Sequence, residues 1–75
     1  MISKKELTEL GFLHIEDYCD YIIESFLNGQ FKQARELYHK LGAGQKYDFG
    51  DFLISHDVCS NWSMTELEFI YFLEV

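Results

Sequence analysis

The sequence predicts an all-α fold, a compact bundle of four to five short helices around a central helical hairpin at residues 15–41. Three observations predict it. Proline is absent, which suits uninterrupted helices. Hydrophobic residues make up 48% of the chain, enough to build a core. Between residues 15 and 41, apolar residues recur with the 3.6-residue period of an amphipathic helix.

The central hairpin consists of two predicted helices that meet at Asn28-Gly29. Glycine readily adopts the positive φ that a helix C-terminus often needs, so the chain can reverse there. The apolar stripe of the first helix is formed by Ile15, Cys19, Ile22 and Phe26, with Tyr18 and Ile23 at its edges. The apolar face of the second helix, about residues 30–41, is formed by Phe31, Ala34, Leu37, Tyr38 and Leu41.

Further helices are expected on both sides of the hairpin, within one domain that spans residues 1–75. Ser3 and Glu6 have the spacing of a capping box, which predicts a short helix over about residues 4–10. Residues 45–55 fit a helical stripe, but they also alternate as a strand would. Helix is favoured, because a lone short strand has no partner in this chain.

The last predicted helix follows a second capping box. Ser63 and Glu66 have the required spacing and place this helix at residues 64–73. The segment Phe69–Leu73, FIYFL, also has the propensity of a strand, so both alternatives stay open for it.

The charge of the chain is uneven and predominantly acidic. Its net charge is −7, from 13 acidic and 6 basic residues. Residues 29–46 carry four basic residues and one acid, whereas residues 47–75 carry six acids and no Lys or Arg. Direct binding to nucleic acid is disfavoured, because that affinity comes from Lys and Arg displacing counterions. The expected partner is a protein with a basic surface.

Seven acidic residues are the candidates for this contact. They are Glu16, Asp17, Asp20 and Glu24 on the first helix of the hairpin, extended by Asp48, Asp51 and Asp57. The alternative is a solvated face that only keeps the protein soluble. The neighbouring basic helix could also neutralise part of the first set, which would make residues 47–75 the better docking surface.

The aromatic C-terminal segment is the second candidate surface. It contains Trp62, Phe69, Tyr71 and Phe72. Small domains bury most of their aromatic residues, so these side chains fit a core. They also fit a contact with a partner or a twin subunit. The second reading gives the alternative function, a structural or assembly protein that forms a homodimer or larger homo-oligomer.

The sequence contains no motif that indicates a catalytic or metal-binding site. His56 and Cys59 are three residues apart, but structural zinc sites show closely paired ligands such as Cys-x-x-Cys, and none exists here. The same pair is a weak basis for nucleophilic catalysis. We therefore expect no enzyme activity, no metal and no cofactor. No signal peptide or membrane span is recognisable, which predicts a cytoplasmic protein.

A pattern of three motifs spans residues 26–49. It consists of Phe26-x-Asn28-Gly29, Gln33-Ala34-x-Glu36-Leu37 and Tyr47-Asp48-Phe49. In this pattern, and in its length, acidity and aromatic content, the chain resembles small bacteriophage-encoded accessory proteins, which include anti-CRISPR and other host-takeover factors. The resemblance implies stoichiometric binding of a host protein in the host cytoplasm, in some cases through an acidic surface that imitates DNA. It identifies no catalytic or binding residues in this chain.

Overall fold

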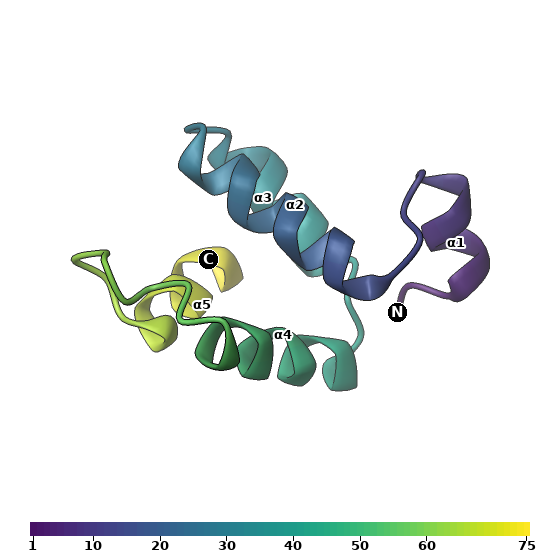
Figure 1. Cartoon of the computed structure of the whole chain (residues 1–75). Coiled ribbons are helices and arrows are strands. Elements are labelled where there is room, and N and C mark those ends of the chain that lie inside the picture. Colours follow the sequence, from purple (N-terminus) through teal and green to yellow (C-terminus); the bar gives the residue numbers. More distant parts are fainter.

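The computed structural model describes all 75 residues and contains helices as its only regular elements. The five helices (Figure 1) are α1 (Lys4–Glu9), α2 (Ile15–Leu27), α3 (Phe31–His39), α4 (Ala43–Ser55) and α5 (Glu66–Glu74). The predicted all-α fold is confirmed, and residues 45–55 belong to a helix.

The helices form two layers with α1 at one end. In Figure 1 the α2–α3 hairpin lies over α4 and α5. Each layer is held within itself by contacts between α2 and α3 and between α4 and α5, and the layers meet where α2 packs on α4 and α3 on α5. The predicted central hairpin is therefore confirmed, and its two buried faces point toward the second layer.

The reversal at Asn28-Gly29 is made by a glycine in the left-handed region. Gly29 has a φ of 80°, and its N–H donates to the carbonyl of Phe26 at 3.0 Å. The N–H of Gln30 donates to the carbonyl of Ser25 at 2.8 Å. These two bonds satisfy carbonyl groups that the end of α2 would otherwise leave free, so the chain turns at the place that the sequence indicates.

The start of α5 differs from the prediction by two residues. The N-cap is Thr65: its Oγ1 accepts from the N–H of Glu68 at 3.2 Å, and Glu68 Oε1 accepts from the N–H of Thr65 at 2.9 Å. The predicted box of Ser63 and Glu66 is therefore wrong. Both pairs have the same spacing, so the sequence alone allows either. Tertiary packing selects the later start, which leaves Met64 half-buried against the core before the helix begins.

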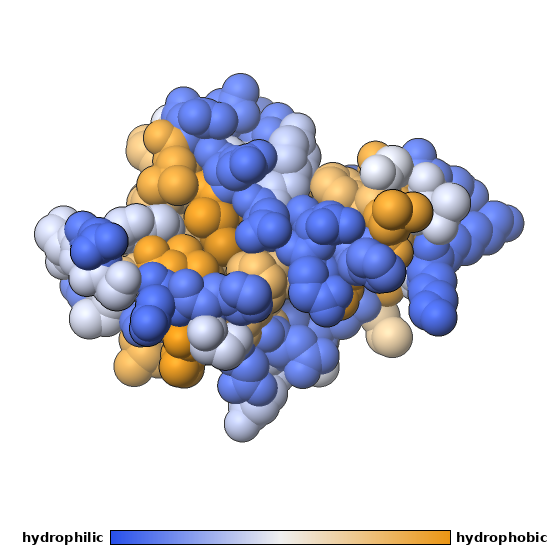
Figure 2. Space-filling view, in the orientation of Figure 1, coloured by the Kyte–Doolittle hydropathy of each residue, from blue (hydrophilic) through white to orange (hydrophobic).

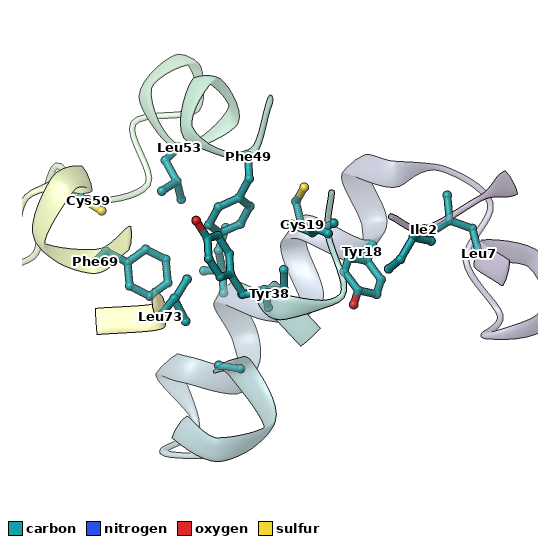
Figure 3. Packing of buried hydrophobic residues seen from close by; sticks show 14 residues of the cluster. Ile2, Leu7, Tyr18, Cys19, Tyr38, Phe49, Leu53, Cys59, Phe69 and Leu73 are labelled. Carbon is teal, nitrogen blue, oxygen red and sulfur yellow. The ribbon is translucent and has the colours of Figure 1, made fainter. Parts of the chain in front are cut away.

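The core lies between the two layers and is rich in aromatic rings. Phe49 and Leu53 of α4 point toward Tyr38, Phe69 and Leu73 (Figure 3), and all five are buried. In α2 the most deeply buried side chains are Tyr18 and Ile22, whereas Ile15 and Phe26 lie half-buried at its two ends. The centre of the predicted stripe is thus shifted toward Tyr18, which the sequence placed at its edge.

The N-terminus is held to α4 by one side chain. The Gln45 Oε1 accepts from the N–H of Ile2 at 2.9 Å and from the N–H of Gly42 at 3.1 Å, and its Nε2 donates to the carbonyl of Ile2 at 2.7 Å. Ile2 itself is buried. Gln45 thus joins the start of the chain to the first turn of α4.

Replacing Gln45 with alanine should lower the free energy of unfolding by about 1–3 kcal/mol, because it leaves part-buried backbone groups of Ile2 without partners. Gln45→Glu is a second test variant, because it keeps an acceptor but cannot donate to the Ile2 carbonyl while it is ionised. We expect it to destabilise the fold as well. Urea denaturation followed by circular dichroism measures both. An unchanged midpoint for Gln45→Ala would contradict this role of the side chain.

Candidate protein-interaction surface

The acidic face of α2 is exposed along its length. All four predicted acidic residues of this helix are exposed: Glu16, Asp17, Asp20 and Glu24. They lie opposite the side chains that pack into the core, such as Tyr18 and Ile22. This separation follows from the helical period, because residues three and four apart share a face.

Asp48 of α4 joins this face where α2 and α4 pack together. Burial, together with the negative charges of Glu16, Asp20 and Asp48, raises the pKa of the Cys19 thiol to about 12. Glu16 and Asp48 also line the same surface hollow of about 440 Å³. Asp20 lies one turn after Glu16 on α2, so the three carboxylates form one surface across the two helices. We call Glu16, Asp20 and Asp48 the α2–α4 acidic surface.

The other two acidic candidates lie elsewhere. Asp51 lines a groove between α4 and α5. Asp57 follows the end of α4 with a φ of 50°, and the N–H of Val58 donates to the carbonyl of Leu53 at 3.0 Å across this turn. Asp57 therefore occupies the left-handed position that glycine usually fills at a helix end. The seven acids predicted as one extended surface are divided among three places.

Two basic side chains, those of Arg35 and Lys46, lie against aromatic rings. Arg35 of α3 donates from Nε to the carbonyl of Phe72 at 3.1 Å, and its guanidinium lies 4.1 Å from the centre of that ring. The Lys46 ammonium lies 5.0 Å from the centre of the Tyr38 ring. Arg35 thus serves the C-terminal end of α5, where a positive charge is favourable.

The four aromatic candidates have different environments. Phe69 is fully buried, and Trp62 and Phe72 are half-buried. These three rings surround Phe26, with centroid distances of 4.7 Å from Phe69, 5.6 Å from Trp62 and 5.3 Å from Phe72. These three side chains belong mainly to the core, which was the first of the two expectations for the aromatic segment. Tyr71, which is 73% exposed, is the member of the set that is open to a partner.

Apolar side chains that the sequence analysis did not select line the α4–α5 groove. Its volume is about 340 Å³, and its apolar lining consists of Tyr47, Ile54, Leu67 and Ile70. Its charged lining consists of Lys46, Asp51 and Glu66. The sequence does contain one feature that could have predicted these residues. Tyr47 and Ile54 are seven residues apart, which places them on one side of the predicted helix and outside its core-facing stripe. Figure 2 shows further apolar atoms gathered between the α2–α3 hairpin and α5.

Cys59 is buried, whereas His56, three residues earlier, is exposed. Burial and the charge of Glu66 raise the pKa of Cys59, which is the opposite of thiolate activation. The His56 ring stacks on Phe52 with a centroid distance of 4.2 Å. No three His, Cys, Asp or Glu side chains lie in positions that could hold a metal ion. None of the five helices combines the length and the hydropathy needed to cross a membrane.

No protein-family model, curated protein or solved structure matches the chain. Its function must therefore be inferred from the surfaces described above.

Proposed function

We propose that this chain is a non-enzymatic binding module that inhibits or adapts a basic, nucleic-acid-handling partner protein, and that the α2–α4 acidic surface makes the contact. The observation that carries the proposal is the exposed acidic face of α2, which Asp48 of α4 joins by lining the same hollow as Glu16. Like charges held close together repel one another, and Lys or Arg side chains of a partner would relieve that repulsion.

The charges around the α2–α4 acidic surface also favour a partner protein with a basic surface. Asp17 and Glu24 extend the negative face along α2, and both are exposed. Arg35 is engaged by Phe72, so this cation is not available to neutralise α2. A surface of one sign speeds the encounter with a partner of the opposite sign and selects against partners of the same sign. It also repels nucleic acid itself, so the protein surface that binds nucleic acid is the better target.

Charge reversal tests this proposal. Immobilised chain is presented to a panel of purified nucleic-acid-binding proteins with basic surfaces, and the dissociation constants are measured by interferometry. We expect Asp20→Lys/Asp48→Lys to weaken binding at least tenfold, which corresponds to about 1.4 kcal/mol. Short duplex DNA should compete for the partner, and raising the salt from 0.05 to 0.5 M should release it.

The matched control is Glu9→Lys/Glu36→Lys. It changes the net charge by the same amount at two exposed residues on α1 and α3, outside the α2–α4 acidic surface. Binding should fall much less with this control. Equal losses for the two double variants would show that only the overall charge matters, and binding that neither salt nor charge reversal alters would refute an acidic contact.

A further inference from the structure

The α4–α5 groove exposes large apolar side chains that the fold itself does not use. Leu67 is 79% exposed, Tyr47 75% and Ile54 62%. Together with Ile70 they line one groove between two helices, and its floor includes Gly50, where a β-carbon would lie 3.5 Å from the Ile70 side chain. Single exposed apolar residues are common, but several that line one hollow with a polar rim mark interaction sites.

The charge around the groove indicates what fits there. Its lining contains two acids, Asp51 and Glu66, and one base, Lys46. The Lys46 ammonium already lies 5.0 Å from the centre of the Tyr38 ring, and residues 47–75 carry six acids without any Lys or Arg. A second copy of this chain would bring the same acids against them. A segment that pairs apolar residues with Lys or Arg would satisfy both parts of the lining, because its apolar side would enter the groove while its cations meet Asp51 and Glu66.

We propose that the α4–α5 groove binds an amphipathic basic helix of the partner protein. This inference rests on the proposed function and adds to it a second, apolar contact, on the α4–α5 pair of helices. Helices that bind in grooves present apolar residues at i, i+3 or i+4 and i+7 along one side. The groove between two packed helices offers a surface of that length, with Tyr47 in the second turn of α4 and Ile54 two turns later, near its C-terminal end.

The test uses two fluorescent 18-residue peptides made only of leucine and lysine. In the first, leucines follow the helical period and form one apolar side; in the second, the same residues are scrambled, so that composition and charge are equal. We expect the amphipathic peptide to bind at least tenfold more tightly than the scrambled one by fluorescence anisotropy. We also expect Leu67→Lys to weaken its binding at least tenfold.

The matched control is Leu27→Lys, which makes the same change at a leucine of α2 that is 59% exposed and lies outside the groove. It should weaken binding no more than threefold. Circular dichroism checks that both variants keep their helices. Tyr47→Ala provides a second groove variant without added charge. We expect it to weaken binding of the amphipathic peptide but not binding of the scrambled peptide.

Three outcomes would overturn the inference. If the two peptides bind equally and Leu67→Lys behaves like Leu27→Lys, basic chains bind through charge alone; the proposed function then stands and the groove does not take part. If neither peptide binds while a basic partner protein still binds, the groove is again excluded. If sedimentation shows a dimer that Leu67→Lys dissociates, a second copy of the chain fills the groove.

Discussion

Replacing Phe69 with alanine should lower the free energy of unfolding by about 3–5 kcal/mol. The side chain is fully buried, and its ring lies 4.7 Å from that of Phe26, 5.3 Å from that of Trp62 and 6.2 Å from that of Phe49, between centroids. Its removal leaves a cavity where both layers meet. A domain of this length is expected to be stable by only about 4–11 kcal/mol, so a large part of the folded population should be lost. Urea denaturation followed by circular dichroism measures the change.

The control is Tyr71→Ala, a change to another aromatic residue of the same helix. Tyr71 is 73% exposed, so its removal should alter the free energy of unfolding by less than about 1 kcal/mol. The pair separates burial from helix propensity, because both variants place alanine in α5. Similar losses at the two positions would contradict the described packing of α5.

Raising the pH from 8 to 11 should strongly destabilise the fold. Burial raises the pKa of Tyr18 to about 12 and that of Cys19 to about 12. Burial and the hydrogen bond that Tyr38 donates to Glu74 at 2.9 Å raise the pKa of Tyr38 as well. The unfolded chain loses these protons first, near the ordinary values of about 8.5 for a thiol and 10 for a phenol. The folded state then holds more protons, so the free energy of unfolding falls as the pH rises.

The fall should begin near pH 8.5, where Cys19 and Cys59 titrate in the unfolded chain, and steepen above pH 10, where the two tyrosines add to it. Each group contributes at most about 1.4 kcal/mol per pH unit. Thermal unfolding between pH 7 and pH 11.5 measures the effect. Cys19→Val removes the thiol and should reduce the loss between pH 8.5 and 10 while leaving the steeper part. A melting temperature that stays constant from pH 9 to 11 would show that these groups are not buried as described.

The helices could be predicted from the sequence because the signals for them are local. The period of apolar residues in α2 and α3, and the glycine at position 29, act over a few neighbouring residues. The limit of such signals is visible at α5, where Ser63/Glu66 and Thr65/Glu68 fit the capping pattern equally well. Only the packing of the last helix on the core decided between them.

The candidate site was less predictable than the fold. Helical spacing placed Asp20 on the exposed side of α2, and that placement is correct. The same reasoning could not show that Asp48 lines one hollow with Glu16, since the two residues belong to different helices and no local pattern predicts how those helices pack on each other. It also grouped Phe69 with Tyr71, although one is fully buried and the other largely exposed. The last helix has apolar and aromatic residues on several sides, so the spacing of its apolar residues does not indicate which side packs against the core.

The amino-acid sequence by itself determined the all-α class, the hairpin and its turn, and the acidic character of the surface, because composition, period and turn residues act locally. The tertiary structure decided which charges and apolar side chains share a surface. It brought Asp48 to the acidic face of α2, attached Arg35 to the end of α5, and formed the α4–α5 groove from Tyr47, Ile54 and Leu67. These arrangements depend on how one helix packs on another, and that packing is set by the whole core.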